Sequence, residues 1–425
     1  MESKPQTTMG FRSMSIGPFR VLKWPEVPGE LGRAQHQVTL EEAFLKTEWL
    51  FPLAREAHTL QAAAGGIGVP LLHWFETIDG KDVMVTDTYG PTLDEVFCRS
   101  GRYFSLQSLL ILADQLLSRV EFIHSRNIIH GNLSPLSFAF GRAEWQKQQV
   151  ILVDLGTEVV PAPTVRNDLQ AISRILSYFY SGAESWEQYQ QRQGLETTAP
   201  VLTRFSAAVA SRETIDYGML RDIFYDAYHD IVLHLEIVMN LRGPRFMGDS
   251  KVPRMGALAG KETTDLFESL DSALSHIGQL SGNFTLALPF RAWSELLDVL
   301  EEVLQIYMTL IARDRPSAEK RMHAMGAYHL PNRLWRDLRW FLKVTANLPR
   351  SFQLSVTAKL YHYLAVLYEV VPSYRLYWAE YLLFLARARK DLEPACGRPA
   401  WTQTVFFWQE ACNMLKAESN VPNLR

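Results

Sequence analysis

The sequence has few cysteines, little net charge and no long apolar run. Its 425 residues include only 3 cysteines, Cys98, Cys396 and Cys412, which are widely spaced, odd in number and in no metal-ligand pattern. This argues against a disulfide framework and predicts a reduced, intracellular setting. A net charge of −3 gives no global field that would attract nucleic acid or an anionic membrane. The start, MESKPQTTMG, has no signal-peptide core, and no run of about 18 apolar residues could span a bilayer. We therefore expect a cytoplasmic or nuclear protein.

The residues that are present suffice for two or three domains, with a hydrophobic content of 47 %. Residues 1–15 are polar and are expected to be a disordered tail, residues 16–235 mix strands and helices, and residues 236–264 are rich in Gly, Pro and basic residues, as in a linker. Residues 265–425 show helical periodicity throughout, so the predicted fold class is α+β with an all-α C-terminal domain. The helices predicted there are Asp265–Leu280, Phe290–Ala312, Asn332–Leu348, Phe352–Val370, Tyr374–Leu392 and Trp401–Lys416.

The stretch Phe122–Gly156 carries the clearest pattern, FIHSRNIIHGNLSPLSFAFGRAEWQKQQVILVDLG. A helix end, a polar loop and a hairpin lead into VILVDLG, which resembles the catalytic loop and metal-binding loop of protein kinases, H-R-D-L-x-x-x-N and D-F-G. The runs GIGVPLLHWFETIDGKDVMVTDTYGPTLDEVF, FSLQSLLILADQLLSRVEFIHS and RNDLQAISRILSYFYSG are similar to the casein kinase I family over residues 36–235. The resemblance implies a bilobal kinase-like fold with a degenerate small β lobe and a helical large lobe.

The positions that would carry phosphoryl transfer are changed. A kinase needs an aspartate as base, a lysine near the moving phosphate and an asparagine for magnesium; the resemblance places Asn132, Ser134 and Ser137 there. An amide cannot take up a proton, Ser134 brings no charge, and a serine hydroxyl is a poor magnesium ligand. His130 is expected to be structural. Asp154 is retained, either as a single metal ligand or as the cap of the following turn.

The nucleotide-binding positions are changed as well. A strand predicted over His36–Glu41 puts Glu41 15 residues before Glu56, where a kinase has its strand lysine. A glutamate there would repel phosphates. The alternative is Lys46, either a displaced phosphate lysine or a solvated surface lysine, and Glu56 is either its former ion-pair partner or an exposed helix residue. If nucleotide binds at all, Asp154, Glu56 and Lys46 are the residues to hold it, and we expect binding of ATP and Mg²⁺ to be weak or absent.

Two further kinase features are missing. The glycines Gly17, Gly29 and Gly32 do not form the G-x-G-x-x-G loop whose backbone amides approach phosphates, and the glycine cluster at 65–68 is predicted to be a turn. From Asp154 to Asp168 there are only 14 residues, too few for an activation segment that presents a peptide substrate.

The C-terminal phrase LPNRLWRDLRWFLKV…VPSYRLYWAEYLLFLARARKDLE resembles the 14-3-3-like helical domain of the ever-shorter-telomere and nonsense-decay adaptor family over about Leu330–Met414. That resemblance implies a phosphate site, with arginines Arg336, Arg339, Arg387 and Arg389 as its counterparts. Arg336 and Arg339 are neighbours on one helix face, and paired arginines suit phosphate. The alternative is that they are exposed and solubilise an aromatic-rich helix. The aromatic residues Trp335, Trp340 and Phe341 are expected in the core.

We therefore expect a catalytically inactive, casein kinase I-like pseudokinase joined to a helical interaction domain, acting as an adaptor or scaffold for proteins, with nucleic acid and membranes not expected as partners. One alternative is a serine/threonine protein kinase with residual or atypical activity through Asp154. Another is a phosphopeptide- or RNA-binding helical adaptor that the kinase-like part supports. Because Leu241–Lys261 lacks apolar periodicity, we also expect the two halves to be separable unless they dock.

Overall fold

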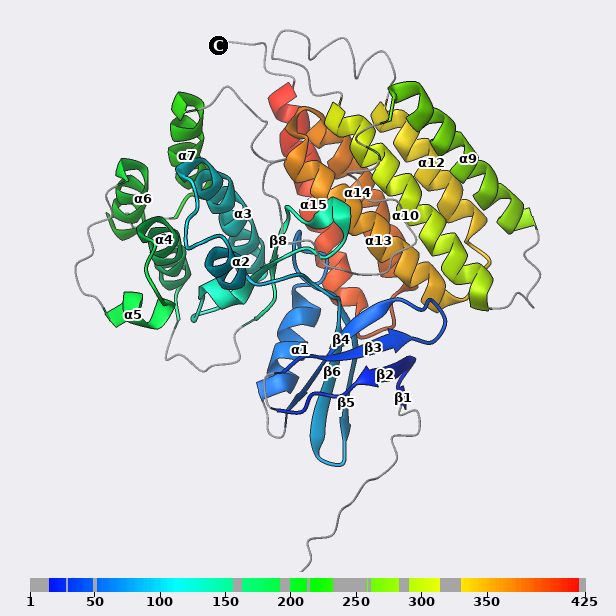
Figure 1. Cartoon of the computed structure of the whole chain (residues 1–425), viewed down its shortest axis with the longest axis horizontal. Coiled ribbons are helices and arrows are strands. Elements are labelled where there is room, and N and C mark those ends of the chain that lie inside the picture. Colours follow the sequence, from blue (N-terminus) through cyan, green and yellow to red (C-terminus); the bar gives the residue numbers. More distant parts are fainter. Residues whose placement is uncertain are drawn as a thin grey trace, which may run out of the picture.

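A computed structural model describes residues 15–27, 30–48, 52–155, 163–191, 199–211, 215–231, 258, 261–282, 290–313 and 330–419. An antiparallel sheet forms the N-terminal part and the remainder is largely helical, which confirms the α+β prediction. Figure 1 shows the sheet at the bottom, helices α2 to α7 on one side above it, and helices α9 to α15 on the other. The predicted tail lies outside the described residues except for Ser15, and so does most of the predicted linker.

The N-terminal sheet has six strands in the order β1-β2-β3-β4-β6-β5. Side chains alternate between a buried and a more exposed face along β4, as period-two strands require. Helix α1 (Pro52–Ala62) contacts β4, β5 and β6 and covers one face. The strands are β1 (Ser15–Ile16), β2 (Phe19–Lys23), β3 (Gly32–His36), β4 (Glu42–Glu48), β5 (Leu72–Ile78) and β6 (Lys81–Thr86).

The strand predicted over His36–Glu41 is wrong, because His36 ends β3 and residues 37–41 form the turn to β4. The His36 ring nitrogen Nδ1 accepts hydrogen bonds from the backbone amides of Val38 (3.2 Å) and Thr39 (3.1 Å). Leu40 has a φ of 59°, a left-handed conformation that a strand does not contain. The alternation of polar and apolar residues here is therefore that of a hairpin turn, and the next strand is shifted toward the C-terminus.

The middle of the chain is a helical layer around α3 (Leu106–Ser125), whose buried face includes Leu109, Leu116 and Val120. This helix and α2 (Leu93–Arg99) each begin with a side-chain cap, from Ser105 and Thr92. The remaining elements of this part are η1 (Pro135–Ser137), β7 (Phe138–Phe140), η2 (Glu144–Gln146), β8 (Val150–Leu152), α4 (Val165–Ser181), α5 (Trp186–Gln191), α6 (Pro200–Ser211) and α7 (Tyr217–Ile231).

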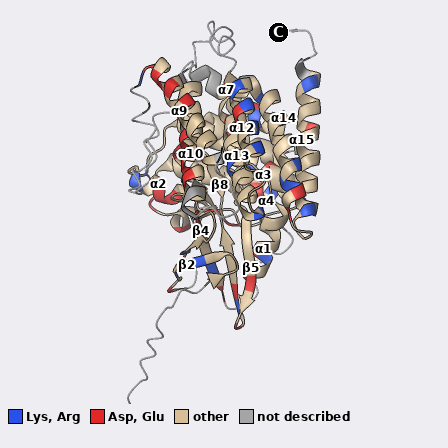
Figure 2. Ribbon diagram, turned by 90° about the vertical axis from the view of Figure 1, so that its right-hand side faces the viewer, with Lys and Arg blue, Asp and Glu red and all other residues tan. Residues whose placement is uncertain are grey.

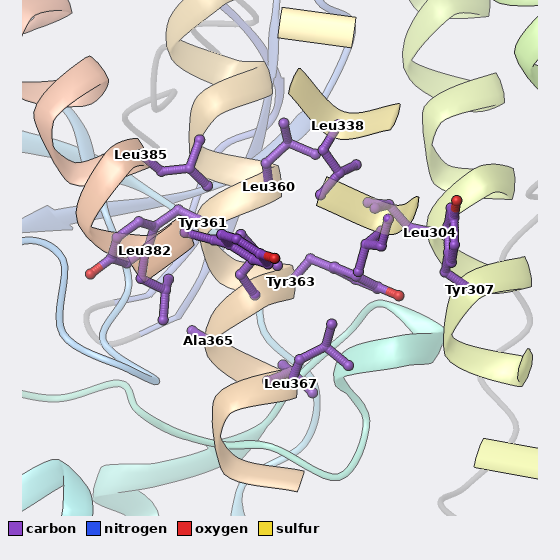
Figure 3. Packing of buried hydrophobic residues seen from close by; sticks show 14 of the residues in the cluster. Leu304, Tyr307, Leu338, Leu360, Tyr361, Tyr363, Ala365, Leu367, Leu382 and Leu385 are labelled. Carbon is purple, nitrogen blue, oxygen red and sulfur yellow. The ribbon is translucent and has the colours of Figure 1, made fainter. Parts of the chain in front are cut away.

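The C-terminal helices confirm all six predicted helices to within a few residues at each end. Their core is made of leucines and aromatic rings from several helices, including Leu304, Leu338 and Leu360, as Figure 3 shows. Prolines precede α13 and begin the short 3-10 turn before α14, where a missing N–H costs no helical bond. The helices are α9 (Thr263–Gly282), α10 (Phe290–Arg313), α12 (Leu330–Val344), α13 (Arg350–Val370), α14 (Arg375–Leu392) and α15 (Arg398–Ser419), with η4 (Pro372–Tyr374).

The helical region docks against the N-terminal half. One hydrophobic cluster joins Ala64, Ile67, Leu71 and Trp145 to the buried side chains of the C-terminal helices. The Arg119 guanidinium on α3, which is fully buried, pairs with the Glu369 carboxylate on α13, with 3.0 Å between Nη2 and Oε2. The halves therefore dock, which is the case that the expectation of separable halves excepted, because side chains of α13 and α15 pack against the first half.

The glycine turn at 65–68, here called the seat, is where α13 and α15 contact the backbone of the N-terminal half. The Tyr361 hydroxyl donates to the Gly65 carbonyl (2.7 Å), and the Thr404 hydroxyl donates to the Ala64 carbonyl (2.7 Å). Gly65 has a φ of +82°, and a Cβ there would lie 2.6 Å from the Thr404 methyl carbon. The segment is a turn, as predicted, and its glycine lets two helices approach the backbone.

The structure also bears on membranes and cysteines. In the part of the chain that the structure describes, no helix combines the length and the apolar character needed to cross a bilayer. The three cysteines are unpaired, with Cys98 and Cys396 exposed and Cys412 buried.

Candidate functional site

Lys46, and not Glu41, pairs with Glu56. The Lys46 ammonium lies 2.6 Å from the Glu56 carboxylate, joining β4 to α1, and 3.5 Å from the Val153 carbonyl. Glu56 is 2 % exposed, so it is not the surface helix residue that one interpretation allowed. Although burial would lower the pKa of Lys46, the nearby Glu56, Tyr89 and Asp154 raise it, so the side chain stays charged. Kinases have a lysine–glutamate pair of this kind between strand and helix.

Glu41 faces the helical region instead. The Ser355 hydroxyl donates to its carboxylate, and the Lys359 ammonium lies 3.4 Å from it and 3.3 Å from Glu301. Both partners are on α13. Glu41 therefore does not pair with Glu56 as predicted; the residue that does is Lys46, five residues further along the chain on β4.

Aromatic rings lie next to this ion pair. The Tyr89 ring packs against the buried cluster of Ala139, Ile151 and Val153 from the β7–β8 hairpin and its exit. On its other side Phe44, which lies two residues before Lys46 on β4, meets it edge-on at 4.8 Å between ring centroids. Burial raises the pKa of the Tyr89 hydroxyl, which is close enough to interact with Lys46, Glu56 and Asp154. Neither ring was predicted from the sequence, although Phe44 lies two residues before Lys46 on the same strand.

The loop after α3 is held from below by Asp168 on α4. One carboxylate oxygen accepts from the His130 backbone amide (2.8 Å) and contacts the His124 ring (2.8 Å), and the other accepts from the Gly131 amide (2.7 Å). The His130 ring nitrogen Nε2 donates to the Asp154 carbonyl (2.7 Å). His130 thus ties the loop to the segment after β8, as a structural histidine does. The sequence located Asp168 only as the start of a helix.

The side chains at the three altered positions serve the loop itself. The Ser137 hydroxyl is 1 % exposed, accepts from the Ser134 amide (3.1 Å) and lies 3.3 Å from the Ser134 hydroxyl, which closes a capping box around η1. Asn132 is exposed, and its backbone N–H donates to the His130 ring nitrogen Nδ1 (3.2 Å). The turn that Asp154 was expected to cap begins outside the described residues. Among those residues, no three His, Cys, Asp or Glu side chains gather as a metal-binding cluster.

A second charged group links the segment after β6 to α13. The Asp87 carboxylate accepts from the Leu71 amide (2.8 Å), lies 2.7 Å from the His73 ring and lies 3.9 Å from His362. Burial would raise the pKa of Asp87, but its attraction to His73, the hydrogen bonds and His362 lower it to about 2. Burial also lowers the pKa of His362, against the pull of Asp87. Asp87, His73 and His362 therefore interact with one another, as side chains of a structural contact do.

The arginines predicted to bind phosphate separate into two groups. Arg336 and Arg339 line a groove of about 800 Å³ between α12, α13 and α14. Arg387 instead bonds the Gln409 side chain (2.9 Å) on α15. Arg389 is 6 % exposed and bonds the Glu393 carboxylate (2.5 Å) and the Leu354 carbonyl (2.6 Å), so the expectation that it joins the other arginines is wrong.

The aromatic residues of α12 also differ from expectation. Phe341 is in the core, but Trp340 is 36 % exposed and lines the groove with Trp335. Lys343 and Phe384, which also line this groove, were not predicted from the sequence. The seven-residue spacing from Arg336 to Lys343 was the available signal for Lys343, since it places both residues on one helix face.

A scan against protein-family models finds no match for this chain.

Proposed function

We propose that the protein is a casein kinase I-like pseudokinase that lacks phosphoryl-transfer chemistry and acts as a protein adaptor or scaffold. The observation that carries the proposal is the packing of the Tyr89 and Phe44 rings beside the Lys46–Glu56 pair. A nucleotide whose phosphates reached Lys46 would need the space between β4 and the β7–β8 hairpin, which the rings of Phe44 and Tyr89 occupy. In this proposal the Lys46–Glu56 pair of a kinase site is retained, but aromatic rings occupy the space that the nucleotide would need.

The loop supports the same proposal. Asp168 and His130 hold its backbone in place, but the position for a base carries Asn132 and the position for a metal ligand carries the buried Ser137. An amide accepts no proton and a hydroxyl already used within a cap offers little to a cation. A loop kept in shape without acid–base groups fits a role in binding.

The rival is a serine/threonine kinase with residual activity. The Lys46–Glu56 pair with Asp154 nearby favours it, because this is the charge arrangement that positions nucleotide phosphates in kinases. Such activity would require Tyr89 and Phe44 to leave the cleft.

The test is a thermal-shift titration of the full chain with ATP and Mg²⁺, followed by a phosphoryl-transfer assay on casein and acidic peptides. We expect no shift at ~1 mM ATP, whereas a ligand at about 100 times its Kd would add about 2.7 kcal/mol of stability. The variant Phe44→Ala with Tyr89→Ala shows whether opening the cleft alone restores binding. Phosphate transfer by the wild-type chain that is lost in Asp154→Ala would overturn the proposal.

A further inference from the structure

The groove between α12, α13 and α14, here called the basic groove, has a lining of one dominant charge. Of its lining residues, Arg336, Arg339 and Lys343 are basic and Asp391 alone is acidic. The three basic residues follow one another at intervals of three and four positions, so they form one stripe along the outer face of α12. Figure 2 shows blue segments along α12 and α14, within a chain whose net charge is −3.

Most of the positive charge in the basic groove is not paired with a carboxylate of the described residues. Arg336 contacts Asp337 (3.0 Å) through Nε while its side chain remains 69 % exposed. Arg339 and Lys343 form no ion pair with any described side chain, and the Arg339 guanidinium instead lies over the Phe384 ring, 5.7 Å from its centroid. This differs from Arg333, one turn earlier, which pairs with Asp271 (2.6 Å).

The lining of the basic groove also includes aromatic rings that pack on their neighbours. Trp335 stacks on Tyr381 with 4.3 Å between ring centroids and meets Phe384 edge-on at 5.2 Å, which fixes the tryptophan in place. Trp340 and Phe384 are 36 % and 42 % exposed. Exposed tryptophan and arginine side chains around a depression are typical of the residues that contribute most to protein–protein binding.

We infer that the basic groove binds a short acidic peptide segment of a partner protein, with carboxylates at Arg339 and Lys343 and one bulky apolar side chain against Trp340 and Phe384. The charge complementarity selects an acidic segment. The seven-residue stripe from Arg336 to Lys343 is about 10 Å long at 1.5 Å per residue, which three or four extended peptide residues span. Nucleic acid would need a longer basic track. This inference rests on the proposed adaptor role and names the chemistry of the partner.

Fluorescence anisotropy with the full chain tests it. The probe is a fluorescein-labelled peptide of about twelve residues built from Asp, Glu, Leu and Phe, and its control has Asn and Gln in place of Asp and Glu. We expect saturable binding of the acidic peptide, weakened by raising NaCl from ~50 to ~500 mM, and at least about tenfold weaker binding of the control.

Substitutions in and outside the basic groove test whether the peptide binds there. Arg339→Glu and Trp340→Ala should each weaken binding of the acidic peptide about tenfold. The matched control is Arg387→Glu, another exposed helix arginine outside the groove, which should change Kd less than about twofold. Circular dichroism and Tm confirm that each variant is folded.

Three results would overturn the inference: equal binding of the amide control, equal loss in Arg387→Glu, or binding of only a phosphorylated peptide or oligouridylate through Arg339. The first would indicate an apolar groove, the second non-specific attraction and the third a phosphate ligand. The ATP titration and kinase assay test the pseudokinase proposal separately, because Arg339 and Trp340 line the basic groove on α12 whereas Lys46 pairs with Glu56 between β4 and α1.

Discussion

Where α13 meets the N-terminal half, basic side chains are paired with carboxylates, whereas on the face of α12 and α14 that carries the basic groove they are exposed. Lys359 lies between Glu41 and Glu301, and Arg119 is buried against Glu369. Lys343 has no such partner among the described residues. The comparison separates charge used for internal contacts from charge available to another molecule, and the following changes test that separation.

The largest effect is expected on removing the Glu369 carboxylate. The variant Glu369→Ala leaves Arg119 buried without its partner, and removing one member of a buried ion pair typically costs about 3–5 kcal/mol. Urea unfolding of the full chain measures the loss. The control, Glu380→Ala, removes an exposed partner of Lys416 and should cost at most about 1 kcal/mol. Equal effects of the two changes would mean that the interface contact is no stronger than a surface pair.

Removing the Lys359 ammonium should have the next largest effect. Burial would lower the pKa of this lysine, but Glu301 and Glu41 raise it, so the charge is present in the folded protein. Lys359→Met leaves the two carboxylates without a cation and should cost about 2–3 kcal/mol in free energy of unfolding. Lys416→Met, at the exposed pair with Glu380, is the comparison variant. A neutral result for Lys359→Met would indicate that the methionine packs as well as the ion cluster binds.

Protonation of Asp87 should make the stability of this interface depend on pH. Its pKa falls from an ordinary value of 3.8 to about 2, so the carboxylate stabilises the folded state above about pH 4 and loses this contribution as the pH falls toward 2. The shift corresponds to about 2 kcal/mol. The stability difference between wild type and Asp87→Asn should therefore shrink by about that amount between pH 6 and pH 2. A difference that stays constant over this range would show that Asp87 is not held by His73.

The smallest effect on stability is expected in the basic groove. Arg339→Glu removes an exposed cation–π contact, and surface substitutions of this kind usually change the free energy of unfolding by less than about 0.5 kcal/mol. Urea unfolding beside the binding assay measures both consequences. A stability loss comparable with that of Glu369→Ala would place Arg339 among the internal contacts and remove the contrast between the faces.

The helices were predictable because each carries several local signals at once. Ser105 caps α3 ahead of an apolar face at three- and four-residue spacing, and Pro349 and Pro372 mark the ends of α13 and the start of the next turn. The register of the first strands was not predictable in this way. The His36 ring accepts hydrogen bonds from two backbone amides and so stabilises a turn. Such side-chain contacts to the backbone compete with strand formation, and the alternation of polar and apolar residues does not reveal them.

The candidate sites were predictable only in part. The altered loop residues Asn132, Ser134 and Ser137 follow from a local motif, and the pair Arg336 and Arg339 from helix spacing. Tyr89 meets Phe44, and Phe384 meets Arg339, only through tertiary packing. Arg389 shows the same limit, because its neighbours Leu354 and Trp401 come from other helices.

The seat at the glycine turn ties the order of synthesis to the order of folding. The carbonyls of Ala64 and Gly65 receive their hydroxyl donors from residues 340 and 296 positions later in the chain. At about 5–20 residues per second, translation needs roughly 17–70 s to supply the later donor. Until α13 and α15 have been synthesised, the apolar side chains of Ile67 and Leu71 lack part of the hydrophobic cluster that they join in the complete chain. The first half therefore completes its folding only near the end of translation, and a chain that stops before α15 leaves this seat exposed to chaperones and proteases.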